Sequence, residues 1–193
     1  EVDRTVTHMK DEAANFPDLA WISTRSKDGV DNLAPYSFFT VASCNPPVIL
    51  YTQVTPRAGL GKDTLKNLIE TGECVVNIVN SDLMDIMNAT SASLPIDQSE
   101  FSHAGVEYCV SQKVSALSVK KSPVRYECRL RETLSIGDLA GSGTVVLLDV
   151  TSVYVRDDLY SDGMINQEHL DSVGKMGGDG YYVSAKYVEI DRP

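Results

Sequence analysis

The sequence has few of the residues that mark a secreted or metal-binding protein. Its 193 residues include 4 cysteines without a CxxC pair, and 3 histidines, His8, His103 and His169, without metal-ligand spacing. Widely spaced cysteines of this kind are typical of reduced core thiols in a cytosolic protein, not of a disulfide framework or zinc site. We therefore expect the cysteines to be free core residues, as Cys74 and Cys128 inside apolar runs suggest, and we expect no metal site.

Positive charge and long apolar runs are also scarce. There are 17 Lys and Arg against 27 Asp and Glu, which gives a net charge of -10, and the basic residues are scattered. Such a chain has no basic stripe to bind a nucleic-acid backbone. No apolar run approaches the roughly 20 residues that span a bilayer, and residues 1–16 lack the apolar core of a signal peptide. The expected protein is cytoplasmic, with no nucleic-acid partner and no membrane partner.

Strand patterns dominate what the sequence does contain. A length of 193 residues suits a single domain over 1–193 with a substantial core. Extended segments rich in β-branched and aromatic residues are expected at 19–25, 33–41, 46–53, 74–79, 113–117, 124–136, 144–156 and 181–190. Asp28 and Gly29 mark a hairpin turn between the first two. Short helices inserted among these strands predict an α+β fold built on an antiparallel barrel.

Two helices have recognisable signals. The first is expected at 62–72, with Asp63 or Thr64 as N-cap and Gly72 at the C-terminal end. Leu65, Leu68 and Ile69 should share one face of it. A second short helix is expected in "SDLMDIMNATSA", 81–92, capped by Ser81 or Asp82. Residues 1–16 could form another helix, while 94–110 should be irregular.

The start of the first helix is a candidate anion site. In "GKDT", Gly61–Thr64, a flexible glycine, a cation, a carboxylate and a hydroxyl meet at a helix N-terminus, where free N–H groups and the helix dipole favour negative charge. The alternative is that these residues only cap the helix. The four residues alone leave both interpretations open.

The segment "NLAPYSFF", 32–39, is the second candidate. Pro35 has no N–H, so a strand that contains it leaves one ladder position unpaired. Main-chain groups freed in this way could face a flat heterocycle. The alternative is an edge strand that the proline protects from aggregation.

Several motifs together carry a family resemblance. The stretches "LAWISTRSKDGVDNLAPYSFFTVASCNPPVILYT", "KDTLKNLIETGECVVNIV", "MNATSA", "SEFSHAG", "SPVRYECRL", "SGTVVLLDV" and "VGKMGGDGYY" follow one another from about Pro17 onward. In this order and spacing the chain resembles the flavin reductase-like, FMN-binding split-barrel family, most closely its flavoredoxin-type branch. The fold implied is an antiparallel split β-barrel with inserted short helices.

The resemblance implies a homodimer that binds FMN, or FAD as in some relatives. NAD(P)H would deliver a hydride to flavin N5, and the reduced flavin would pass electrons to a monooxygenase or another acceptor. The flavin carries the chemistry, so no catalytic side chain is expected. The ring would lie along residues 32–37, and the phosphate would be held by hydroxyls and a cation. The implied cofactor-binding residues are Ser23, Thr24, Asn32, Leu33, Ala34, Pro35, Tyr36, Ser37, Ser43, Lys62, Asp63, Thr64 and Lys175.

Departures from the family pattern concern the electron donor. The chain reads "FPDLAW", with Pro17 and Asp18 where many relatives have Arg-Pro-Ile, and "GDLAGSG" has no histidine for nicotinamide. Lys175 replaces a usual arginine, which keeps the charge but loses the bidentate fork. The alternative function is therefore an FMN-binding electron-transfer or carrier protein without its own NAD(P)H reductase activity. A third is a scaffold that has lost the flavin.

Single residues outside these motifs have simpler interpretations. Trp21, the only tryptophan, is expected in the core, and His103 on an exposed loop. Tyr181 and Tyr182 are adjacent in a strand, so at most one of them can face a ligand.

Overall fold

The protein is described from a computed structural model that covers residues 19–56, 62–161, 163–183 and 190. The helix expected within residues 1–16, Gly61 of the "GKDT" segment and most of the final strand fall outside these described residues. Within them, no helix is both long and apolar enough to cross a membrane.

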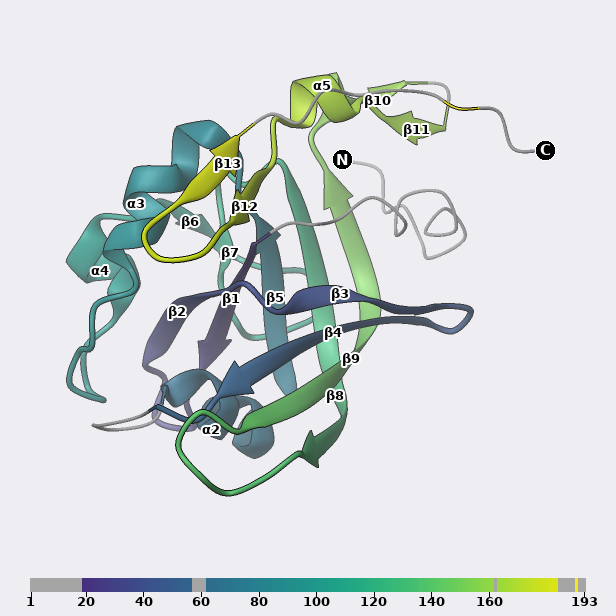
Figure 1. Ribbon diagram of the computed structural model, residues 1–193. Helices are drawn as coiled ribbons and strands as arrows, with labels where there is room; N and C mark the ends of the chain where they lie inside the picture. The colour runs from purple at the N-terminus through teal and green to yellow at the C-terminus, as the bar shows by residue number, and fades with distance from the viewer. Residues whose placement is uncertain (1–18, 57–61, 162, 184–189, 191–193) are drawn as a thin grey trace.

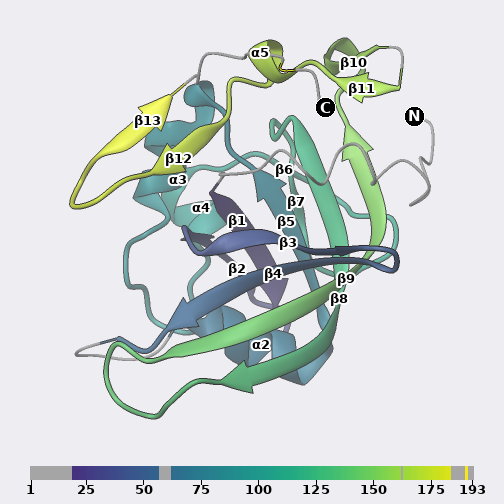
Figure 2. The same ribbon diagram turned by 45° about the vertical axis from the view of Figure 1, so that its right-hand side comes forward.

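A seven-stranded antiparallel sheet forms the body of the molecule (Figure 1). Its strands, in spatial order, are β2 (Asp31–Tyr36), β1 (Ala20–Arg25), β5 (Glu73–Ile78), β8 (Val124–Ser135), β9 (Gly143–Val155), β4 (Pro47–Val54) and β3 (Phe39–Cys44). The sheet curls so that β3 and β4 pass across β1 and β5, as Figure 2 shows from a second side. Since the two edge strands, β2 and β3, do not pair, the barrel stays open between them.

Short elements surround this barrel. The helices are α2 (Asp63–Thr71), α3 (Met84–Ala89), α4 (Glu100–Ala104) and α5 (Gln167–Leu170), with 3-10 turns at η2 (Ser81–Leu83) and η3 (Asp157–Leu159). Small hairpins pair β6 (Tyr108–Cys109) with β7 (Ser118–Val119), β10 (Tyr160–Ser161) with β11 (Met164–Ile165), and β12 (Val173–Lys175) with β13 (Tyr181–Val183). In Figure 1, α2 lies at one end of the barrel and α3 and α4 lie beside β2.

The core has two parts on opposite faces of β1 and β2. Ile22 and Ala34 face the barrel interior, where they join a cluster that includes Tyr51. Trp21 and Leu33 face the other way, toward the residues of α3 and α4. This follows from the two-residue period of a strand. The expectation that Trp21 is a core residue is confirmed, because its side chain is fully buried.

Several expected elements differ from those observed. The strand expected at 33–41 is two strands, because the chain leaves β2 after Tyr36 and begins β3 at Phe39. The strand expected at 113–117 is wrong, because those residues form no strand and the next strand, β7, begins at Ser118. Residues 94–110 are not irregular throughout, since they contain α4 and β6. The second helix begins as a 3-10 turn and ends at Ala89 instead of reaching residue 92.

The expected helix caps are also corrected. The N-cap of α2 is Lys62, without a side-chain cap bond, so neither Asp63 nor Thr64 caps it. Likewise the N-cap residue of η2 is Asn80, not Ser81 or Asp82. Gly72 ends α2 as expected, in the left-handed region at φ 74°.

Burial divides the apolar face of α2 and corrects one further expectation. On α2, Ile69 has 59% of its surface exposed, whereas Leu68 is fully buried. All four cysteines are free, and Cys74 and Cys128 are buried as expected, but Cys44 is exposed and is not a core residue. His103 is exposed, although it lies on α4 and not on a loop.

Candidate functional site

A cleft lies along the outer edge of β2, the edge that faces away from β1. Residues from four segments line it: Asn32 and Ala34 of β2, Lys62 and Asp63 at the start of α2, residues 90–94 after α3, and Glu100 of α4. The space it encloses, including the part open to solvent, is about 460 Å³.

The outer edge of β2 presents main-chain groups to this cleft. In an antiparallel pair, alternate residues turn their N–H and C=O groups away from the neighbouring strand. Leu33 is such a residue, since its N–H donates to Glu100 Oε2 at 3.0 Å. Pro35 lies two positions further along and therefore also faces outward, so its missing N–H removes no bond to β1. Its carbonyl oxygen accepts a hydrogen bond from Lys62 Nζ at 3.1 Å.

A buried polar network fixes the side chain of Asn32. Its Oδ1 accepts from Thr64 Oγ1 at 2.7 Å and from Thr24 Oγ1 at 3.4 Å. Its Nδ2 donates to Glu100 Oε2 at 3.0 Å. Asn67 Nδ2 in turn donates to Thr24 Oγ1 at 3.2 Å. The network thus joins β1, β2, α2 and α4, and it sets the orientation of the Asn32 amide.

Two charged side chains of the cleft have pKa values shifted in opposite directions. Burial raises the pKa of Glu100, and the hydrogen bonds from Leu33 and Asn32 only partly oppose this. Desolvation lowers the pKa of Lys62, while the charge of Glu100 opposes that change. The Lys62 ammonium also lies 4.6 Å from the centre of the Tyr36 ring. Shifted groups of this kind in a cleft are typical of a ligand site.

Segment 90–94 is attached to the core through Trp21. The indole Nε1 donates to Thr90 Oγ1 at 2.9 Å, and Thr90 Oγ1 donates to the Met87 carbonyl at 2.7 Å. The end of α3 and the cleft wall that follows it are therefore held against β1.

The structure brings together some of the predicted site residues and not others. Asn32, Ala34, Lys62 and Asp63 line the cleft, while Thr24, Leu33, Pro35 and Thr64 support it through the bonds above. The side chain of Tyr36 is buried, where its hydroxyl donates to Gln53 Oε1 at 2.9 Å. Ser37 is exposed in the turn that separates β2 from β3.

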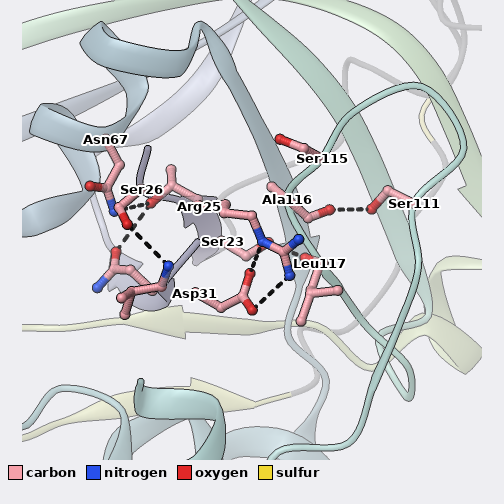
Figure 3. Close-up of polar contacts among 12 residues, drawn as sticks. Ser23, Arg25, Ser26, Asp31, Asn67, Ser111, Ser115, Ala116 and Leu117 are labelled. Carbon is pink, nitrogen blue, oxygen red and sulfur yellow. Dashed lines mark hydrogen bonds and ion pairs between the residues drawn. The ribbon is translucent and has the colours of Figure 1, made fainter. Parts of the chain in front are cut away.

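The remaining three predicted residues also lie outside the lining. Ser23 is fully buried, and its hydroxyl donates to the Leu117 carbonyl at 2.5 Å, on the side of the sheet drawn in Figure 3. Ser43 is near the end of β3, at the β3–β4 turn. Lys175 Nζ donates to the carbonyls of Met176 and Gly180, each at 3.1 Å, and so holds its own hairpin. Their roles in binding stay predictions.

Sequence reasoning missed Glu100 and the wall formed by residues 90–94. Glu100 lies within "SEFSHAG", one of the stretches of the family resemblance, but a single carboxylate in a polar segment does not by itself indicate a buried position. Residues 90–92 were expected at the end of the helix that Leu83, Ile86 and Met87 predict, and "MNATSA" was likewise noted only as part of the resemblance. Within the described chain, no group of three or more His, Cys, Asp or Glu side chains is placed to hold a metal ion.

Comparison with known proteins assigns the chain to a family. The sequence model of the flavin reductase like domain matches residues 17–174, which is most of the chain. The chain belongs to the flavin reductase-like family. An uncharacterised protein of Halalkalibacterium halodurans is 35% identical over 177 residues, which cover 91% of this chain and 85% of that protein.

Two solved structures of this family share the architecture. Nitrilotriacetate monooxygenase component B from Bacillus cereus is 31% identical, with a TM-score of 0.84 over 92% of this chain and 89% of its own. Flavoredoxin of Desulfovibrio vulgaris (Miyazaki F) is 16% identical, with a TM-score of 0.76 over 90% of this chain and 89% of its own. The predicted α+β split-barrel fold and the resemblance to this family are both confirmed.

Proposed function

We propose that the protein is an FMN-binding oxidoreductase whose flavin lies in the cleft along β2. The observation that carries the proposal is that the outer edge of β2, within "NLAPY", opens onto a cleft in a chain of the flavin reductase-like family. A bound flavin would supply the hydride and electron chemistry, so the chain has to bind it, orient it and shield it.

The residues of the cleft fit such a ligand. A flavin has a flat ring with donors and acceptors along one edge, and the outer edge of β2 borders the cleft with main-chain groups. Of these, the Leu33 N–H already donates to Glu100 and the Pro35 carbonyl already accepts from Lys62, so a ring edge would share or replace these bonds. Ala34, Ala92 and Leu94 provide apolar surface for the ring. Lys62 and the hydroxyl groups of residues 91 and 93 provide a cation and donors for a phosphate. The single cation favours FMN, with one phosphate, over FAD.

Titration with FMN tests this proposal. The visible absorbance and fluorescence of FMN should change on binding, with saturation at one flavin per chain. A protein that leaves the FMN spectrum unchanged at concentrations well above those of the chain would overturn the proposal and favour a scaffold without flavin. FAD and riboflavin titrations measure how much of the affinity depends on the phosphate.

We further propose that NAD(P)H reduces the bound flavin and that the electrons pass to a partner monooxygenase or another acceptor. The similarity to a monooxygenase component B supports a partner enzyme. The alternative, an electron carrier without its own reductase activity, is favoured by Lys175. Its ammonium donates to carbonyls within its own hairpin and lies 4.6 Å from the Tyr181 ring centre. Because these contacts occupy the ammonium, it is less available to bind NAD(P)H in place of the usual arginine.

Stopped-flow mixing separates the two functions. Loss of the oxidised flavin band on mixing with NADH or NADPH under anaerobic conditions is expected for a reductase. If the band persists with both donors but disappears with dithionite, the flavin is competent and the carrier function replaces the reductase. The proposed flavin site is unaffected by that second result.

A further inference from the structure

Glu100 has contacts that differ from those of an ordinary helix residue. It is the first residue of α4, yet only 6% of its surface is exposed. A single oxygen, Oε2, accepts both the Leu33 main-chain N–H and the Asn32 Nδ2 group, each at 3.0 Å. Both donors belong to β2, so one carboxylate oxygen fixes the main chain and a side chain of the strand that borders the cleft.

The charged surroundings of Glu100 do not explain its burial. Asp63 at the start of α2 faces it with a like charge, which disfavours the ionised carboxylate. Lys62 is the nearby cation, but its Nζ donates to the Pro35 carbonyl. Tyr36 of β2 also feels the charge of Glu100. Burying a carboxylate without an ion pair destabilises a fold. The two hydrogen bonds to β2 are the interactions that offset this cost at Glu100.

We propose that Glu100 is a positioning residue of the cleft, where its Oε2 holds the Leu33 N–H and the Asn32 amide in the arrangement that a flavin ring requires. The inference rests on the proposed flavin site. With Glu100 in place, Asn32 Oδ1 is turned toward Thr64, and the Leu33 N–H on the outer edge of β2 has a fixed acceptor. Without it, the Leu33 N–H loses its acceptor and the Asn32 amide can rotate.

The positioning role requires a hydrogen-bond acceptor at the place of Glu100 Oε2 and does not require its charge. Variants that keep or remove this acceptor therefore distinguish positioning from a general structural role. In Glu100→Gln, the Oε1 atom can take the place of Oε2 and accept both bonds. In Glu100→Asp the side chain is one methylene shorter and cannot reach both donors. Glu100→Ala removes the acceptor altogether.

The first experiment measures FMN affinity in these variants. Glu100→Gln should bind FMN within about threefold of the wild-type protein, whereas Glu100→Ala and Glu100→Asp should bind at least tenfold more weakly. Glu107→Ala is the matched control, since Glu107 follows α4 but pairs with Lys120 and Lys121 at the surface. It should bind FMN as the wild-type protein does. Wild-type affinity in Glu100→Ala, or equal weakening in the Gln and Ala variants, would overturn the proposal.

The second experiment needs no flavin. Amide hydrogen exchange of Leu33 should be at least tenfold faster in Glu100→Ala than in the wild-type protein, and unchanged in Glu100→Gln. Equal exchange rates in all three would also overturn the proposal, because the bond to Leu33 would then hold nothing in place. If the wild-type protein binds no FMN, the proposed function fails and the ligand part of this inference fails with it. The exchange rates still decide whether Glu100 fixes β2.

Discussion

Lys62 connects two sides of the cleft, because it begins α2 and its ammonium reaches the carbonyl of Pro35 on β2. If FMN binds there, this ammonium is the cation next to its ring or phosphate. We predict that Lys62→Met, which keeps the length of the side chain and removes the charge, weakens FMN binding at least tenfold, or about 1.4 kcal/mol. Fluorescence titration measures the two dissociation constants.

The control for Lys62 is Lys66→Met, one turn further along α2, at an exposed position outside the cleft. It changes the net charge by the same amount and should leave the affinity within about twofold. Equal affinity in the Lys62 variant and the wild-type protein would show that the "GKDT" segment has no part in binding.

Glu100 gives a prediction for stability that is independent of any ligand. Burial raises its pKa in the folded state, so between the unfolded value of about 4.3 and the raised one the native protein binds more protons than the unfolded chain. The stability due to this group is therefore greatest below the unfolded pKa and is lost as pH rises through the folded one. Glu100→Gln does not titrate and keeps both bonds, so its free energy of unfolding relative to wild type should increase from pH 4 to pH 8.

Urea denaturation at several pH values measures this difference. Glu107→Gln is the control of opposite sign, because its hydrogen bond with Lys121 lowers the pKa of Glu107. That variant should gain nothing relative to wild type as the pH rises. A difference between wild type and Glu100→Gln that is flat or falls with pH would contradict the raised pKa.

Among the structural elements, the end of α3 has the clearest single contact. Thr90 is 2% exposed, and its hydroxyl is the acceptor for the buried Trp21 indole. We predict that Thr90→Val destabilises the protein by about 1–3 kcal/mol, since the indole N–H stays buried without a partner. Thr90→Ser keeps the hydroxyl and should restore most of the loss. Urea unfolding followed by Trp21 fluorescence measures both, and equal stability of the Val and Ser variants would contradict the role of this bond.

Element by element, the sequence predicts what depends on local pattern and misses what depends on distant partners. Gly72 ends α2 where expected, because a left-handed residue after a helix is a local requirement. Asp63 or Thr64 was expected to cap α2, but the Thr64 hydroxyl donates to Asn32 of β2 instead. That competing partner is 32 residues away, so no local signal announces it.

The candidate site shows the same division. The segment "NLAPYSFF" was expected to leave a ladder position unpaired at Pro35, but Pro35 lies opposite Trp21 of β1 and its missing N–H removes no bond to that strand. Leu33 and Pro35 face the cleft because β2 is an edge strand. Glu100, which accepts the Leu33 N–H on this edge, lies 67 residues further along the chain. Its importance depends on burial against β2, which an isolated "SEFSHAG" cannot reveal.

At the scale of the whole molecule, the barrel was predictable because long antiparallel strands separated by turns have few ways to bury both faces. What the strand pattern could not predict is how side chains pack on the open side of the barrel, where the edge strands β2 and β3 do not pair. Between β2 and β4, Tyr36 and Tyr51 have ring centres 4.7 Å apart, and the Tyr36 hydroxyl reaches Gln53. These side chains connect the β1–β2 pair with the β3–β4 pair across the open side of the barrel.

The homodimer that the family resemblance implies is the last property of the whole molecule to test. Each chain has a net charge of -10, so two chains repel each other, and added salt screens that repulsion. We predict a mass of about 42 kDa, twice the 21.1 kDa of one chain, in light scattering after gel filtration. The dimer dissociation constant should fall as salt rises from about 0.05 M to 0.5 M. A mass of one chain at all salt concentrations would contradict the dimer. A dissociation constant that rises with salt would show instead that opposite charges meet across the interface.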